Sequence, residues 1–381
     1  MNRLRASWSR AWPVISVPLG AVLLALVVAA IVALVSSVFT DRGFDPALPI
    51  KAYIGLFEGA FFGLDHIVNT LVNATPLVLG GLAVGLGFKA GLFNIGVQGQ
   101  FLIGAVCAAG TGAALASAPG PLAISAALLV GALAGAAWGF IPGALKAWTG
   151  AHEVVTTIML NFIGASLVAF LVLHVLQAPG YSFARTGELG NAELPTAGFL
   201  SPDLGRLHLG IFLTLLFVPA VGWLLFRSTI GFEIRTVGAN PDAARYAGMR
   251  PALLIILTMS LSGLLAGAAG GIEILGASHY MIASYGTSVG FDSITVALLG
   301  RSHPAGILLS ALLLGALRAG AGSMQLEAHI PVELVDVIQA VILLFLAADM
   351  IVRQLLRIRR AERALDAVAA ASETYAKKVA S

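Results

Sequence analysis

Long apolar runs separated by short polar stretches fill almost the whole chain. Runs close to the ~20 residues that cross a bilayer as a helix predict ten transmembrane helices. We place them at about 14–38, 66–88, 93–116, 121–147, 153–177, 209–227, 252–275, 287–300, 304–322 and 333–356. The pattern predicts an all-α, polytopic membrane protein, with a transmembrane domain over residues 1–356 and a cytoplasmic tail over 357–381.

One predicted helix and two connections are irregular. The run at about 287–300 is short and flanked by glycine, so this helix is tilted, broken or re-entrant. The connections at about 40–65 and 178–208 are long and carry Pro, Gly and aromatic residues. We interpret both as outside loops that could contact an external partner.

The basic residues orient the predicted helices. Cytoplasmic connections of membrane proteins carry an excess of Lys and Arg. With both termini in the cytoplasm, the inside set is Lys89, Lys146, Arg227, Arg235, Arg245, Arg250, Arg301, Arg353, Arg357, Arg359, Arg360 and Arg363. The outside connections hold only Arg42, Lys51, Arg185 and Arg206, with Arg318 near an outside end. Both termini are therefore predicted to be cytoplasmic.

Composition agrees with a chain embedded in lipid. Hydrophobic residues make up 58% of the 381 residues and charged residues 11%, whereas soluble domains carry about 25% charged residues. Glycine occurs 44 times, and Gly131, Gly135, Gly139 and Gly143 repeat at every fourth position. Small residues at this spacing let two membrane helices approach closely. We expect that face to pack against another helix.

The stretch 85–105, GLGFKAGLFNIGVQGQFLIGA, places polar groups among apolar ones. Lys89 fits a cytoplasmic turn, but Asn94, Gln98 and Gln100 fall at the start of the third predicted helix. Polar groups at membrane depth persist only when packed in protein or lining a wet cavity. Two interpretations remain open, interhelical hydrogen bonding or a cavity or gate element close to a transport pathway.

Two other helices raise the same alternatives. Glu153, Thr157 and Asn161 recur at every fourth position and form one polar stripe on an apolar helix. In the second helix, Asn73 and Thr75 precede Pro76. The pair His152–Glu153 does not begin an HExxH zinc motif, because position 156 is a threonine. No metal site, cofactor or catalytic residue is predicted.

Asp292 is the least expected of the polar residues in the segment 278–304. A carboxylate at or near membrane depth is by default a candidate functional group. The alternative is an interfacial helix cap, because Gly290 precedes Asp292 and an apolar run follows it.

The longest cytoplasmic connection, 226–251, contains a helix start. Asn240 suits the N-cap, Pro241 the first helical position, Asp242 the first turn, and Gly248 the end. A short helix on the membrane face would be a docking surface; the alternative is a solvated loop. The chain has no GxxxxGK[ST] motif, so any ATP used in transport must be bound by another subunit.

Five segments together resemble the permease subunits of ABC importers of the branched-chain amino acid, ribose and simple-sugar class. They are GFKAGLFNIGVQGQFLIGA, GAHEVVTTIMLN, RTVGANPDAARYAGM, FDSITVALLGRSHPAGILLSALLLGALRAGA and PVELVDVIQAVILLF. The resemblance covers about residues 65 to 350 and is greatest to permeases for nucleosides or simple sugars. It implies a ten-helix fold like that of the vitamin B12 importer's permease, working by alternating access in a bacterial cytoplasmic membrane.

The resemblance also implies partners and residue roles. The partners are a cytoplasmic ABC ATPase, a second related permease chain forming a heterodimer, an external substrate-binding lipoprotein or periplasmic protein, and the lipid bilayer, without nucleic acid. The segment 228–250 would couple to the ATPase through Gly238, Asn240, Asp242, Ala243, Arg245 and Gly248. The predicted pathway set is Asn73, Thr75, Phe93, Asn94, Gln98, Asn161 and Asp292. Asp292 and Arg301 match motif positions without an assigned contact.

Two rival functions would make different demands on the sequence. An ion-coupled secondary transporter of a small polar solute would use Asp292 or Glu273 as its coupling carboxylate. An intramembrane enzyme would need converging His, Asp and Glu residues. The histidines at 152, 174, 279 and 303 instead lie scattered near helix ends.

Overall fold

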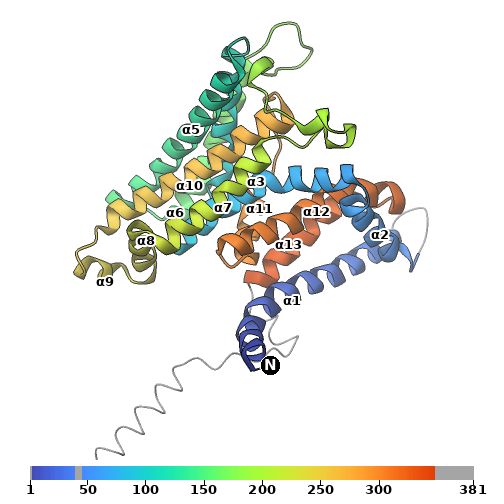
Figure 1. Cartoon of the computed structure of the whole chain (residues 1–381), viewed down its shortest axis with the longest axis horizontal. Helices are drawn as coiled ribbons and strands as arrows, with labels where there is room; N and C mark the ends of the chain where they lie inside the picture. Colours follow the sequence, from blue (N-terminus) through green and yellow to red (C-terminus); the bar gives the residue numbers. More distant parts are fainter. Residues whose placement is uncertain (1, 39–44, 348–381) are drawn as a thin grey trace, which may run out of the picture.

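The computed structural model describes residues 2–38 and 45–347, and these form a bundle of helices (Figure 1). The helices are α1 (Asn2–Val38), α2 (Leu48–Phe61), α3 (Leu64–Lys89), α4 (Val97–Ala114), α5 (Gly120–Thr149), α6 (Glu153–His174), α7 (Gly210–Arg227), α8 (Thr229–Ala239), α9 (Pro241–Tyr246), α10 (Pro251–Glu273), α11 (Val289–Leu299), α12 (Pro304–Ala328) and α13 (Glu333–Ala347). A π-helical turn, Ile274–Ser278, extends α10.

Each of the ten predicted spans has a helical counterpart. Among the described residues, eight helices are long and apolar enough to cross a membrane: α1, α3, α4, α5, α6, α7, α10 and α12. The eighth predicted span is the shorter apolar helix α11, and α13 is described only as far as Ala347. The predicted tail 357–381 lies outside the described residues.

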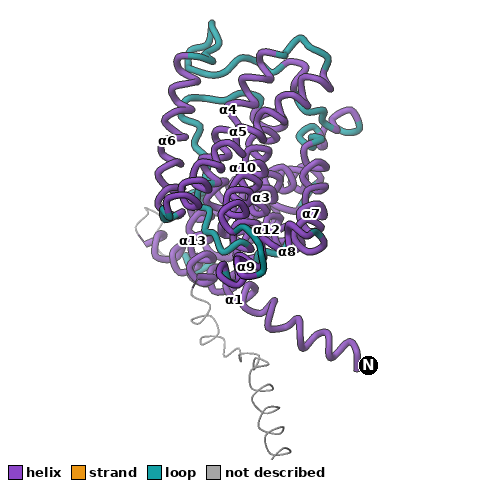
Figure 2. Tube along the Cα trace, turned by 90° about the vertical axis from the view of Figure 1, so that its left-hand side faces the viewer, coloured by secondary structure: helices purple, strands orange, loops and turns teal. Residues whose placement is uncertain are grey.

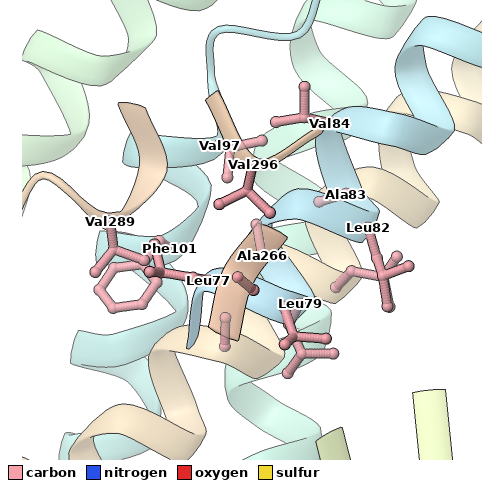
Figure 3. Close-up of a cluster of buried hydrophobic side chains, with 14 of the residues drawn as sticks. Leu77, Leu79, Leu82, Ala83, Val84, Val97, Phe101, Ala266, Val289 and Val296 are labelled. Atoms are coloured by element: carbon pink, nitrogen blue, oxygen red, sulfur yellow. The ribbon is translucent and has the colours of Figure 1, made fainter. Parts of the chain in front are cut away.

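The interior of the bundle is formed where α3, α4, α10 and α11 meet. Leu77, Leu79 and Leu82 of α3 are fully buried there, together with Phe101 of α4 and Val296 of α11. Figure 3 shows these side chains gathered around the middle of α3. α3 is therefore the central helix, whereas most residues of α5, α6 and α7 remain on the outside of this chain.

The glycine face of α5 packs against α10 and α4, as predicted. A Cβ added at Gly135 would overlap the carbonyl oxygen of Gly263 and lie 2.6 Å from Cα of Gly267. One added at Gly131 would lie 2.8 Å from the carbonyl oxygen of Gly104 in α4. Such distances mean that the helix backbones touch, which gives dispersion contacts where no hydrophobic effect drives association.

The prediction of a loop over 40–65 is wrong where α2 lies. Its small residues Ala52, Gly55 and Gly59 are buried. A Cβ added at Gly55 would lie 3.2 Å from Cα of Met324 in α12. With 14 residues, α2 is too short to be recognised as a span by hydropathy, but it is long enough to bury a small-residue face against α12.

The third predicted helix begins later than expected. α3 ends at Lys89 and α4 begins at Val97, so residues 90–96 are not helical and the prediction of a helix from 93 is wrong. Gly91 has φ +71°, which favours glycine. The Asn94 side chain accepts a hydrogen bond from the Gly96 N–H at 2.9 Å, a local bond that competes with helix formation.

The two ends of the bundle carry different structures. α8 and α9 lie at one end, at the left of Figure 1, and the long connection 175–209 lies at the other. Figure 2 shows the same separation from the side. The predicted loop 178–208 is held in place, because Leu194 N–H donates to Leu275 O at 2.8 Å and Thr186 N–H donates to Met281 O at 2.9 Å.

Candidate transport pathway and coupling segment

Asn94 joins three segments of the bundle. Its Nδ2 donates to Ser262 Oγ of α10 at 2.8 Å and to Gln100 Oε1 of α4 at 3.1 Å. Ser262 Oγ in turn donates to Ala83 O of α3 at 2.7 Å. Asn94 is 1% exposed. In this chain the side chain therefore makes the contacts expected of interhelical hydrogen bonding.

Gln98 and Asn161 fix α4 in the same way. Gln98 Nε2 donates to Thr287 O, and its Oε1 accepts from Gly290 N–H, both at 2.8 Å, which joins α4 to the start of α11. Asn161 of α6 accepts from Gly99 N–H at 2.8 Å and donates to Ile95 O at 3.0 Å. Both side chains are buried. A role for them in the transport pathway stays a prediction.

The remaining predicted pathway residues in this region are dispersed. Asn73 donates to Asn69 O and Thr75 to Leu71 O, each at 2.8 Å and each within α3. Phe93 is 38% exposed and contacts Phe88 with ring centroids 5.1 Å apart. Thr75 is buried and Asn73 is half-buried. These hydrogen bonds and the ring contact do not link the three side chains to Asn94.

Replacement of Asn94 by leucine should destabilise the bundle. The Gly96 N–H, Ser262 and Gln100 would lose a partner inside the protein, at about 1–3 kcal/mol for each polar group left unsatisfied. We expect a lower melting temperature in detergent, with the KM for uptake unchanged in the protein that remains. A changed KM at normal melting temperature would instead support contact of Asn94 with the solute.

Asp292 forms a polar cluster between α11, α12 and α13. It makes an ion pair with Arg318 of α12, accepts from Ser288 Oγ at 2.9 Å, and Ser288 Oγ accepts from Arg318 Nη2 at 2.7 Å. The Gln339 amide faces the same carboxylate and, with its NH2 group turned toward it, donates to the two oxygens at 3.0 and 3.1 Å. Arg318 and Gln339 were missed as site residues, because nothing in their local sequence indicates Asp292 as a partner.

The predicted helix start in the connection 226–251 is confirmed. Asn240 Oδ1 accepts from the N–H groups of Asp242 and Ala243, both at 3.0 Å, so Asn240 caps α9. Asp242 and Arg245 lie 3.7 Å apart on its exposed side, and Gly248 ends the turn with φ +84°. The connection also contains α8, so it forms two helices rather than one helix within a loop.

Gly238, near the end of α8, lies against the connection between α3 and α4. A Cβ added at Gly238 would overlap the carbonyl oxygen of Lys89 and lie 2.8 Å from the backbone nitrogen of Gly91. Only glycine permits this backbone approach. Four other predicted coupling residues, Asn240, Asp242, Ala243 and Arg245, are exposed, as is Tyr246 with 95% of its surface accessible. They form a free surface at this end of the bundle.

His208 lies at the opposite end, just before α7, and has no counterpart in the predictions. It is 1% exposed, and a Cβ added at Gly276 would lie 2.5 Å from its Nδ1. Among the described residues, this Nδ1 has no hydrogen-bond partner. Burial, together with the nearby charges of His279 and Arg206, lowers the pKa of His208 to about 4. The imidazole is therefore neutral at pH 7.

This burial predicts acid sensitivity. Because the pKa of His208 in the folded state lies below its ordinary value, its neutral form favours folding; the contribution is complete above pH 6.5 and is lost as the pH falls toward 4. At pH 5 the loss should be about 2 kcal/mol. We expect His208→Gln to flatten the melting temperature between pH 7.5 and 5, whereas exposed His152→Gln should follow the wild type. Parallel profiles for wild type and His208→Gln would contradict this.

Comparison with known proteins identifies the family. The family described as the permease component of the branched-chain amino acid transport system matches residues 66–347. The chain is 39% identical to the guanosine ABC transporter permease protein NupP of Bacillus subtilis, over 88% of this chain and 94% of that protein. It is 35% identical to the nucleoside ABC transporter permease protein NupB of Lactococcus lactis, over 84% and 89%.

A sugar permease is also similar. The glucose ABC transporter permease protein TsgB13 of Haloferax volcanii is 33% identical over 78% of this chain and 80% of that protein. No solved structure matches. The family match covers most of the chain, in the segment that contains α3 to α13. The chain therefore belongs to the family of permease components of the branched-chain amino acid transport system.

Proposed function

We propose that this chain forms one half of the pathway of an ATP-driven importer for nucleosides. The observation that carries the solute class is the 39% identity to a guanosine permease across nearly the full length of both proteins. The similar glucose permease makes a simple sugar the second candidate. As a permease component of an ABC importer, the chain is a non-catalytic transport subunit, and a partner ATPase hydrolyses the ATP.

The arrangement of the helices supports different functions for the two ends of the bundle, with the ATPase at one end and solute delivery at the other. α8 and α9 would face the cytoplasm and dock the ATPase through the exposed surface around Asn240 and Arg245. The connection 175–209 would then face outward, where a substrate-binding lipoprotein or periplasmic protein delivers the solute. A second, related permease chain would complete the pathway in the bacterial cytoplasmic membrane. This orientation agrees with the distribution of basic residues.

The test is uptake of labelled adenosine, guanosine, uridine and ribose into cells with and without the gene. Each measurement is repeated after ATP depletion with the ion gradients clamped. We expect gene-dependent nucleoside uptake that stops when ATP is removed. Uptake of ribose alone would favour the sugar candidate. Uptake that continues without ATP and follows the proton gradient would overturn the assignment of an ATP-driven importer.

A further inference from the structure

A largely apolar cavity that also contains two carboxylates, Asp292 and Asp336, lies between α11 and α13, outside the hydrogen-bonded network around Asn94. Its volume is about 200 Å³, and its lining includes Ser288, Phe291, Asp292, Thr295, Asp336 and Gln339. Phe291 is 47% exposed and Asp336 is also exposed, so the cavity opens away from the interior of this chain. The exposed carboxylate of Asp336 would be costly against lipid, so we expect this part of the cavity to face a solute or a partner chain.

The inner wall of this cavity is fixed. The charge of Asp292 is balanced by Arg318, and its oxygens also accept from Ser288 and face the Gln339 amide. Gln339 and Thr295 are almost completely buried. Because the protein itself engages the Asp292 carboxylate, Ser288 and Gln339, we interpret this wall as a support, with Asp292 as a positioning residue.

The rim of the cavity, in contrast, carries a carboxylate and an aromatic ring that could contact a solute. Asp336 lies one turn before Gln339 on α13, and within the part of the chain that the structure describes no side chain hydrogen-bonds to it or pairs with it. Its carboxylate therefore offers two acceptor oxygens. Phe291, on α11, offers an exposed aromatic ring at the same cavity. A solute that satisfies both would carry adjacent hydroxyl groups and a flat apolar surface.

A ribonucleoside has this combination. The two neighbouring hydroxyls of its ribose can both donate to one carboxylate, and charged acceptors make the stronger hydrogen bonds. Its base can stack on an aromatic ring. Sites that enclose a drug-sized ligand measure about 300–1,000 Å³, so a cavity of about 200 Å³ holds only part of a nucleoside. The rest would lie where a second permease chain completes the pathway.

We propose that Asp336 and Phe291 form a solute-contact site that selects nucleosides with an intact ribose. This inference rests on the proposed function. In the proposed orientation α13 begins at the outer end of the bundle, whereas α11 begins deeper, beside Gln98 in the first turn of α4, so the site would receive the solute inside the pathway, after its release from the external binding protein. Asp336 would accept from the 2′- and 3′-hydroxyls, and Phe291 would contact the base.

The experiment compares maximal uptake rates for guanosine and 2′-deoxyguanosine in cells with the complete transporter. Saturating concentrations keep the external binding protein loaded, so differences in rate report on the permease. We expect the wild type to favour guanosine about tenfold, in line with loss of a hydrogen bond to a charged group, and Asp336→Asn to reduce this preference to about twofold or less. Glu333→Gln is the matched control, because Glu333 is an exposed carboxylate on the same helix that does not line the cavity.

A second variant tests the aromatic contact. Phe291→Leu should lower the maximal rate for guanosine several-fold and leave its preference over 2′-deoxyguanosine in place. The amount of each variant in the membrane is measured by immunoblotting. We expect normal amounts, because both substituted positions are exposed. If the preference is unchanged in Asp336→Asn, or absent from the wild type, the inference is overturned while the proposed function stands. If the wild type shows no gene-dependent nucleoside uptake, the proposed function fails and the inference fails with it.

Discussion

Gly135→Leu should abolish the folded protein. The new side chain would be forced into the backbone of α10, because even a Cβ at this position overlaps the Gly263 carbonyl oxygen. Overpacking in a well-packed interior costs about 1–3 kcal/mol and sometimes more, and here the obstacle is backbone rather than a movable side chain. We expect at least a tenfold loss of detergent-extracted, monodisperse protein, measured by fluorescence-detected size-exclusion chromatography.

Gly322→Leu provides the matched control for this prediction. Gly322 is also a helical glycine, in α12, but a Cβ there would meet nothing within 4 Å. Both variants add the same side chain, so the comparison separates the effect of close helix approach from that of leucine itself. Equal yields from the two variants would show that α5 and α10 can separate without loss of the fold.

Replacement of residues 240–248 by a flexible Gly–Ser linker should abolish transport while the protein still inserts. These residues form the capped helix α9 and its end, and they supply most of the exposed surface that we assign to the ATPase. We expect uptake to fall to the level of cells without the gene, and co-purification of the ATPase to be lost. The melting temperature of the permease should change little, because Ala244 is the one buried residue in α9.

Finer variants separate the helix from its sequence. Asn240→Ala removes the cap and should weaken α9 by about 1 kcal/mol, whereas Asn240→Asp keeps an equally good cap. Uptake should therefore be reduced by the first and retained by the second. Normal uptake with the linker in place would refute the coupling role for this segment.

The sequence predicted the positions of the eight long apolar helices among the described residues, because apolar runs of spanning length have few alternatives. It also predicted α9, since Asn240, Pro241 and Gly248 act on their own neighbours along the chain. It failed for α2, whose 14 residues bury a small-residue face without reaching the length of a span. The hydropathy of a segment indicates that it avoids water. It does not show whether the segment is buried in lipid or against another part of the protein.

The sequence also could not predict which side chains on different helices pair with each other. The partner of Asp292 is Arg318, on the next helix, and that of Asn94 is Ser262, 168 residues away. Such pairs depend on the rotation of each helix about its axis, which helix packing determines. The unwound segment 90–96 shows the same limit, because its path depends on contacts with α6, α8 and α10 as well as on its own glycines.

The contact between Gly238 and Gly91 has a mechanical consequence. Neither residue has a side chain that could change rotamer and absorb a displacement. The end of α8 and the connection 90–96 between α3 and α4 are therefore expected to move together. The connection is tied through Asn94 to α10 and through Ile95 to Asn161 of α6. A displacement of α8 at this contact would therefore be transmitted to α10 and to α6 together.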